Sequence, residues 1–131
     1  MSSTPLHGVL PIAPTPFDEH DEVDYAGQKR ILDFLVDAGV DAVCILANYS
    51  EQFSLTDDER ERLITLSLEH VAGRVPVIAT TSHYSRKVAA ERSRRAQHAG
   101  AAMVMLIGPL TAMASFPPRG PAAPPRRDPT V

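Results

Sequence analysis

Residues 45–52 read Ile-Leu-Ala-Asn-Tyr-Ser-Glu-Gln, and this stretch is the most informative one about the fold. An apolar run over residues 42–47 gives way within one residue to side chains that carry hydrogen-bonding groups. Thr56 and Glu59 follow at the spacing of a capping box, which predicts a helix from residue 57. A buried strand that leads into a polar turn and a helix is how α/β proteins build small-molecule sites. The competing interpretation is a surface turn whose Asn and Ser satisfy the backbone.

Four segments have the composition of β-strands. Prolines in the first segment permit an extended strand, but not a central strand of an antiparallel sheet. The other three are near-continuous apolar runs, which are typical of strands buried on both faces of a parallel sheet. The expected strands span residues 8–14, 40–47, 75–80 and 101–107.

Three helices are expected between these strands, and an Ala-Gly pair ends each of them at intervals of about 30 residues. This interval is the size of one strand-plus-helix unit. Asp24 is the expected N-cap of the first helix, and Arg60 is expected on the solvated face of the second. The alternation predicts an α/β fold, either a doubly wound sheet or the first half of an eight-stranded barrel. No Gly-x-Gly-x-x-Gly follows a strand, which disfavours a nucleotide-binding sheet.

Composition excludes several classes of function. The 131 residues correspond to one domain or part of one, and the net charge of −3 argues against a nucleic-acid partner. Cys44 lies in an apolar run and is expected to be a small buried hydrophobe. No stretch has the length of a membrane span, so we expect no membrane partner and a cytoplasmic location. His83 has no second ligand at suitable spacing, so no metal site is expected.

Several short motifs occur in a fixed order between residues 8 and 107. Together with the turn that ends in Glu51, they resemble the dihydrodipicolinate synthase / N-acetylneuraminate lyase family. The resemblance implies that residues 1–107 form the N-terminal half of a (β/α)8 TIM barrel, with about four strands and three helices. It also implies a small-molecule 2-keto acid substrate, no cofactor and a homo-oligomeric full-length enzyme. The motifs are Gly8-Val9, Thr15-Pro16-Phe17, Ala38-Gly39-Val40-Asp41, Leu55-Thr56-x-x-Glu59-Arg60 and Gly73-Arg74-Val75-Pro76-Val77-Ile78-Ala79.

The resemblance also implies a mechanism. In that family a lysine on the sixth strand forms a Schiff base with the keto carbon, and a tyrosine on the fifth strand relays protons. The protonated imine is an electron sink for C–C cleavage, aldol addition or loss of a β-hydroxyl. The turn after the second strand, usually Gly-Thr-Thr-Gly-Glu, holds the substrate carboxylate.

Asn48, Tyr49, Ser50 and Glu51 stand at this turn and are the substrate-binding residues that the resemblance implies. Asn48 and Ser50 can still donate hydrogen bonds, and Tyr49 adds bulk with a polar tip. The Asn-Tyr-Ser-Glu-Gln version resembles a branch that handles 2-keto-3-deoxy sugar acids, as a dehydratase. The alternative is a turn that has drifted because it no longer has a function.

The composition changes abruptly after residue 107. Seven of residues 108–131 are proline, which predicts a disordered Pro/Arg/Ala-rich tail, and no tyrosine stands where the family has its Pro-Tyr-Tyr segment. Translation of a GC-rich gene in a shifted frame yields such residues, so a frameshift is the leading explanation. The alternative is a polyproline segment over residues 117–121 that docks in an aromatic groove.

The sequence contains two lysines, Lys29 and Lys87, and both are expected on outer helices. No catalytic residue is therefore assigned. We expect a truncated member of a Schiff-base-forming 2-keto acid lyase/dehydratase family that is inactive alone. The alternative is a non-catalytic half-barrel fragment or assembly partner. Open sheet edges predict that the isolated chain self-associates.

Overall fold

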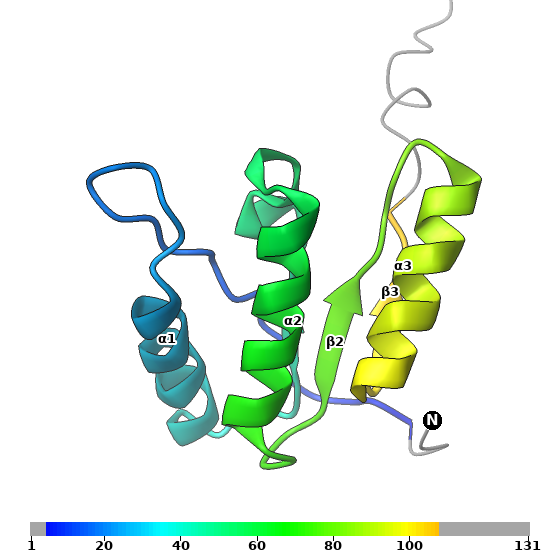
Figure 1. Ribbon diagram of the computed structural model, residues 1–131. Helices are drawn as coiled ribbons and strands as arrows, with labels where there is room; N and C mark the ends of the chain where they lie inside the picture. The colour runs from blue at the N-terminus through cyan, green and yellow to red at the C-terminus, as the bar shows by residue number, and fades with distance from the viewer. Residues whose placement is uncertain (1–4, 108–131) are drawn as a thin grey trace, which may run out of the picture.

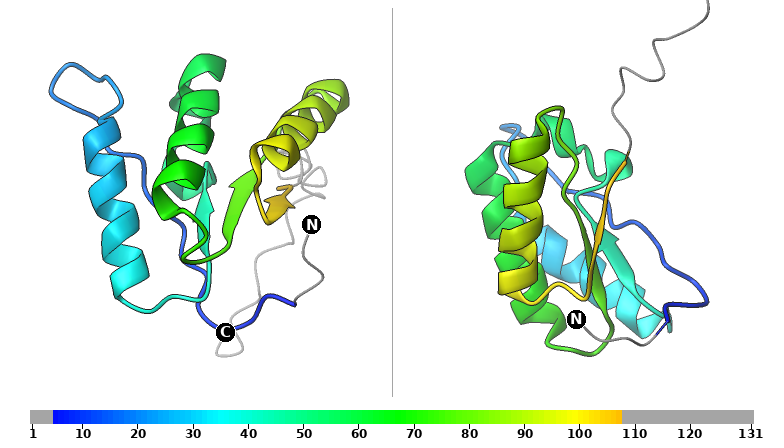
Figure 2. Two further views of the ribbon diagram at one scale, coloured as in Figure 1. Left: turned by 60° about the horizontal axis from the view of Figure 1, so that its bottom comes forward. Right: turned by 90° about the vertical axis from the view of Figure 1, so that its right-hand side faces the viewer.

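The computed structural model describes residues 5–107, and the tail predicted over residues 108–131 lies outside this range. Three parallel strands form one sheet in the order β1-β2-β3. The three helices lie on one face of this sheet, so the described chain has two layers (Figures 1 and 2). The elements are α1 (Tyr25–Asp37), β1 (Val43–Ile45), η1 (Asn48–Ser50), η2 (Gln52–Ser54), α2 (Asp57–Val71), β2 (Val77–Thr80), α3 (Arg86–Ala99) and β3 (Met103–Met105).

The first expected strand, over residues 8–14, is reduced to one parallel bridge between Ile12 and Cys44. Ala13 N–H donates to Cys44 O at 2.8 Å, and Cys44 N–H donates to Pro11 O at 2.9 Å. Pro11 has no N–H to donate and interrupts the ladder, although Asp41 N–H still donates to Val9 O at 2.9 Å. The described sheet therefore has three strands. The prediction of about four strands was wrong because residues 8–14 do not form a full strand.

The helix boundaries follow the local capping signals. The Asp24 side chain accepts the Gly27 N–H at 2.8 Å at the start of α1. Thr56 and Glu59 form the predicted capping box at the start of α2. Gly100, with φ of 102°, ends α3 in the left-handed conformation that glycine adopts without strain. At the end of α2 the left-handed conformation begins at Ala72, one residue before the predicted Gly73.

The larger of two hydrophobic clusters lies between the helices and the sheet. Leu32 of α1, Ile45 of β1 and Leu63 of α2 are its large, fully buried members. A smaller cluster on the strands contains Cys44 and Ile78, so the cysteine is the buried hydrophobe that its context predicts. Desolvation by burial raises the pKa of the Cys44 thiol, which disfavours the reactive thiolate.

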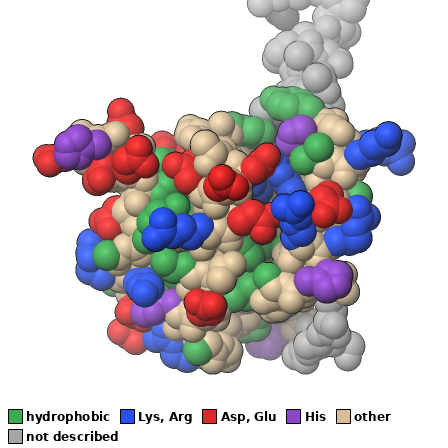
Figure 3. All heavy atoms as spheres, viewed as in Figure 1, with side chains coloured by type: hydrophobic (Ala, Val, Ile, Leu, Met, Phe, Trp, Pro, Cys, Tyr) green, Lys and Arg blue, Asp and Glu red, His purple; other side chains and the backbone are tan. Residues whose placement is uncertain are grey.

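The outward face of the helices carries acidic and basic side chains in alternation (Figure 3). Arg95 of α3, for example, bonds both Glu61 of α2 and Glu91 of its own helix. This is the mixed-sign, solvated face that the sequence predicts. Among residues 5–107, no helix combines the length and the apolar character needed to cross a membrane.

Candidate functional site

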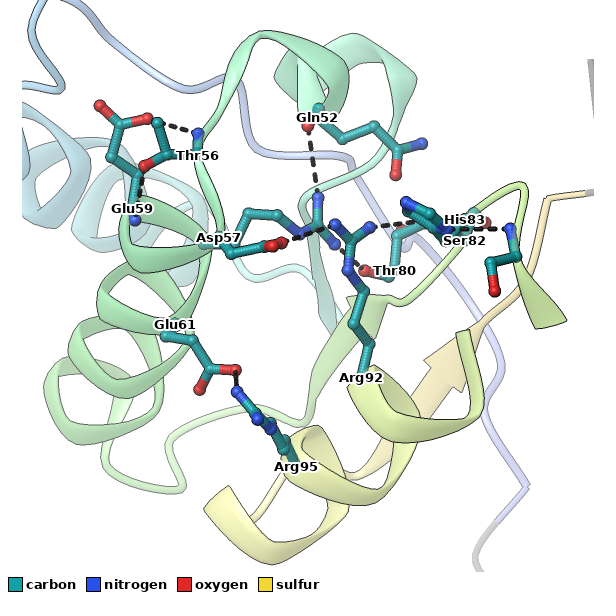
Figure 4. Close-up of polar contacts among 12 residues, drawn as sticks. Gln52, Thr56, Asp57, Glu59, Glu61, Thr80, Ser82, His83, Arg92 and Arg95 are labelled. Carbon is teal, nitrogen blue, oxygen red and sulfur yellow. Dashed lines mark hydrogen bonds and ion pairs between the residues drawn. The ribbon is translucent and has the colours of Figure 1, made fainter. Parts of the chain in front are cut away.

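The carboxyl ends of β1 and β2 lie at the same edge of the parallel sheet. Two polar turns leave this edge, residues 46–54 after β1 and residues 81–85 after β2. Figure 4 shows Gln52 and Ser82, one from each turn, near Asp57 at the start of α2 and Arg92 in the middle of α3. In α/β proteins this edge is where ligands bind.

The turn after β1 has an unusual backbone. Leu46 and Glu51 adopt left-handed conformations, with φ of 59° and 56°. For residues with a Cβ this conformation costs about 1–2 kcal/mol each, and Leu46 is also almost completely buried. Such strain persists only where the surrounding contacts fix the backbone, and it is concentrated at functional turns.

Ser50 fastens this turn to the segment that precedes α1. Its side chain is buried, and Oγ donates to Ala13 O at 2.6 Å while it accepts the Ala47 N–H at 3.2 Å. A serine hydroxyl has one proton, and here that proton is engaged within the protein. In this conformation Ser50 therefore holds the turn in place and does not present a donor to a ligand.

Asn48 and Tyr49 are the exposed polar side chains of η1, and Tyr49 is 69% exposed. The Asn48 side chain is held at one end, because Gln52 Nε2 donates to Asn48 Oδ1 at 2.7 Å. Glu51 is exposed as well, and its backbone N–H donates to Asn48 O at 3.0 Å. Of the four residues predicted to bind substrate, Asn48, Tyr49 and Glu51 are thus accessible to a ligand.

Arg60 of α2 joins the two turns, although the sequence analysis placed it on the solvated face. It is 4% exposed, and its guanidinium donates to Thr80 O at 2.9 Å and to Gln52 O at 3.4 Å (Figure 4). Burial, with a smaller contribution from the charge of Arg92, lowers its pKa to about 10, so the side chain stays charged near neutral pH. Arg60 precedes the buried residues Leu63 and Ser67 at helical spacing, and this periodicity is the signal that could have revealed its burial.

The turn after β2 is fixed by a second arginine. Arg92 of α3 donates to Ser82 O at 2.9 Å and to Asp57 Oδ1 at 2.7 Å (Figure 4). Arg92 holds the pKa of the Asp57 carboxyl below its usual value, mainly through this hydrogen bond. Ser82 Oγ accepts the Ile107 N–H at 2.7 Å, which links this turn to the end of β3. Asp57 is thus part of an ion pair with Arg92, and it lies in the first turn of α2, where the helix dipole favours a negative charge.

Two aromatic rings connect the turns on the outside. Phe53 of η2 and Tyr84 stack with ring centroids 6.0 Å apart and an interplanar angle of 28°. His83 Nδ1 accepts the Ser85 N–H at 2.9 Å, so that nitrogen stabilises the turn. Within residues 5–107 no three His, Cys, Asp or Glu side chains gather in a way that could hold a metal ion.

Neither lysine of the described chain lies on a strand, although Lys87 lines a pocket together with Asp57, Arg60 and Arg92. Lys29 is exposed on α1 and Lys87 is exposed on α3. The described strands end in Ile45, Thr80 and Met105, and none carries a lysine.

Comparison with known proteins identifies relatives. The model of the dihydrodipicolinate synthetase family matches residues 5–117. The chain is 62% identical over 109 residues to the L-2-keto-3-deoxyarabonate dehydratase of Azospirillum brasilense, which covers 82% of this chain and 35% of the relative. It is 35% identical over 104 residues to the 4-hydroxy-tetrahydrodipicolinate synthase of Salinibacter ruber, which covers 79% of this chain and 34% of the relative.

Solved structures of the same family resemble the fold of this chain. Dihydrodipicolinate synthase from Aquifex aeolicus superposes with a TM-score of 0.73 at 32% identity over 76% of this chain and 33% of its own. YagE, an E. coli prophage protein of the same family solved in complex with pyruvate, superposes with a TM-score of 0.72 at 31% identity over 76% of this chain and 33% of its own. The chain thus spans about a third of the length of the curated relatives it matches. On this sequence and structural similarity, the chain belongs to the dihydrodipicolinate synthetase family.

Proposed function

We propose that residues 48–51 form the carboxylate-binding turn of a 2-keto acid enzyme, within the N-terminal half of a (β/α)8 barrel over residues 1–107. The observation that carries this proposal is the turn at the carboxyl end of β1. Ser50 and Gln52 fasten it from within, and Asn48 remains exposed at its tip. A carboxylate held there by N–H donors would fix the keto carbon of a substrate relative to the rest of the barrel. The complex of the relative YagE with pyruvate is consistent with this substrate class.

The substrate we propose is a 2-keto-3-deoxy sugar acid. The 62% identical relative is named for dehydration of such an acid, L-2-keto-3-deoxyarabonate. A hydroxyl β to the keto group leaves readily once the keto carbon is an imine, because the enamine formed at C3 expels it. The exposed Tyr49 hydroxyl and Asn48 amide offer hydrogen bonds to the carboxylate and to hydroxyls of such a ligand.

Binding of the substrate carboxylate and catalytic turnover need different residues. Lys29 on α1 and Lys87 on α3 are both exposed. This exposure supports the proposal that the chain binds the carboxylate but does not form the imine. The proton relay and the Schiff-base lysine that the family uses would have to lie outside residues 5–107. A non-catalytic role as an assembly partner is the second candidate, and it predicts no ligand effect at the turn.

Two measurements on the 131-residue chain test this proposal. Titration with pyruvate, followed by NMR, is expected to shift the backbone amides of residues 48–51 saturably, and pyruvamide, which lacks the carboxylate, is the matched control. Borohydride reduction in the presence of pyruvate is expected to give no specific lysine adduct. Equal shifts with pyruvamide, or none with pyruvate, would contradict the carboxylate-binding turn. A saturable adduct on Lys29 or Lys87 would overturn the separation of binding from turnover.

A further inference from the structure

Gln52 is a buried polar residue that follows the exposed tip of the turn after β1. It is 3% exposed, although it stands next to the exposed residues Glu51 and Phe53. Its backbone carbonyl accepts a hydrogen bond from Arg60, which also bonds Thr80 at the end of β2. Figure 4 shows Gln52 above Thr80, on the turn that precedes α2. The backbone of Gln52 is therefore held by the arginine that joins the turn after β1 to the end of β2.

The side-chain amides of Gln52 and Asn48 have a defined orientation. Gln52 Nε2 donates to Asn48 Oδ1 at 2.7 Å, and Gln52 Oε1 is a buried acceptor without a partner among the described residues. Reversal of both amides would pair Oε1 but would bury an NH2 group, with two donors, away from any acceptor. Buried donors without partners are rarer than buried carbonyl oxygens without partners, so the observed orientation is favoured.

We infer that Gln52 is a positioning residue that selects an anionic ligand by setting which atoms of Asn48 face it. Because Gln52 occupies Asn48 Oδ1, the exposed Asn48 side chain offers its Nδ2 donors to a ligand. An ionised carboxylate only accepts hydrogen bonds, so it matches this donor. The inference rests on the proposed carboxylate-binding turn and adds to it a residue that no ligand needs to touch.

Two substitutions at residue 52 separate this role from simple packing. Gln52→Glu places an acceptor-only group beside Asn48, so Asn48 is expected to rotate its amide and turn Oδ1 toward the ligand. We expect pyruvate affinity to fall about tenfold. Gln52→Met keeps the volume but removes the bond, so that Asn48 rotates freely, and we expect a loss of about threefold. Equal affinity in all three chains, each with a dispersed amide spectrum, would overturn the inference.

Gln52→Glu in an Asn48→Ala background is the control for a direct effect of the added negative charge on the ligand. If Gln52 acts through Asn48, then Gln52→Glu in that background changes pyruvate affinity by less than about twofold. If the added negative charge alone repels the ligand, the tenfold loss persists, and the positioning role is wrong. Residue 52 lies next to α2, so circular dichroism of each chain checks that the helix content is unchanged.

A ligand-free measurement distinguishes failure of this inference from failure of the proposed function. In the unliganded chain, one Gln52 Nε2 proton should exchange slowly with solvent, and both Asn48 Nδ2 protons should exchange quickly. Gln52→Glu should reverse the pattern and slow one Asn48 proton. Slow exchange of an Asn48 proton in the unsubstituted chain would overturn the inference. Absence of a pyruvate effect, with this exchange pattern intact, would instead reject the carboxylate-binding turn.

Discussion

The strands β1 and β3 have the same length and the same parallel direction but different surroundings. All three residues of β1 are buried, whereas Met103 of β3 is 43% exposed and the next two residues are half-buried. β1 pairs with β2 on one side and with the Ile12 bridge on the other. Within residues 5–107, β3 pairs with β2 alone. The prediction that residues 101–107 form a buried strand was therefore wrong for Met103–Met105, which lie at the edge of the described sheet.

The turn that follows β1 is fixed by contacts with several other segments. The turn after β1 is held by Ser50, Gln52 and Arg60, which reach the segment before α1, the residue Asn48 and the end of β2. It therefore has a fixed shape that can present Asn48 to a ligand. A polar turn becomes a candidate site where the strand that leads into it is enclosed by structure on several sides.

The largest expected difference between the two strands is in core packing. Ile45→Ala in β1 should lower the free energy of unfolding by about 2–5 kcal/mol, because Ile45 is 2% exposed and packs with the main core. Met103→Ala in β3 should lower it by less than about 1 kcal/mol, since much of that side chain is already in water. Urea unfolding followed by circular dichroism measures both, and equal losses would show that β3 is as enclosed as β1.

The buried arginine at the junction of β1 and β2 should have the next largest effect. Arg60→Met removes the hydrogen bonds to Thr80 O and Gln52 O but keeps an unbranched side chain, so we expect a loss of about 1–3 kcal/mol. Arg95→Met is the surface control, because its side chain is 56% exposed and its ion pairs are solvated. That change should cost clearly less than Arg60→Met, because solvent screens exposed ion pairs. Comparable losses in the two variants would contradict a linking role for Arg60.

Helix capping gives a smaller contrast between the turn after β1 and the turn after β2. Thr56 accepts the Glu59 N–H at 3.2 Å, so Thr56→Ala should destabilise the protein by about 1 kcal/mol. Ser85 occupies the same position before α3, but its side chain makes no capping hydrogen bond. Ser85→Ala should therefore change the unfolding midpoint very little. A loss at Ser85 as large as that at Thr56 would show that the second cap forms in solution.

The smallest effect is a pH dependence of the contact between α1 and the end of α2. Asp33 accepts hydrogen bonds from Arg74 and bonds His70, and these contacts, Arg74 first, lower its pKa. A lowered carboxyl pKa stabilises the fold above the unfolded value, which is 3.8, and this contribution is lost as the pH falls through the folded value.

Unfolding midpoints at pH values of about 5 and about 2.5 would measure this effect. Asp33→Asn should reduce the difference between the two midpoints slightly, because the contact is exposed to solvent. Asp57→Asn is the matched variant on the side of β3, since Arg92 of α3 lowers the Asp57 pKa in the same way. No change in either variant would mean that both pairs are screened in solution.

The sequence by itself determined the features that depend on neighbours along the chain. The start of α2 follows from Thr56 and Glu59, three residues apart, and the end of α3 follows from Gly100. These interactions form within one turn of helix, so they are the same in any fold that contains the helix. The order of apolar strands and helices, together with the family motifs, likewise predicted an α/β fold with a parallel sheet.

Only the tertiary structure decided which side chains are enclosed and which atoms they engage. Ser50 donates to Ala13, 37 residues earlier in the chain, and this contact cannot be inferred from a local pattern. Arg60 looks like a solvated helix residue until β2 places the Thr80 carbonyl beside it. Met103 is apolar yet exposed, because burial depends on the strands and helices that lie against it and not on its own hydrophobicity.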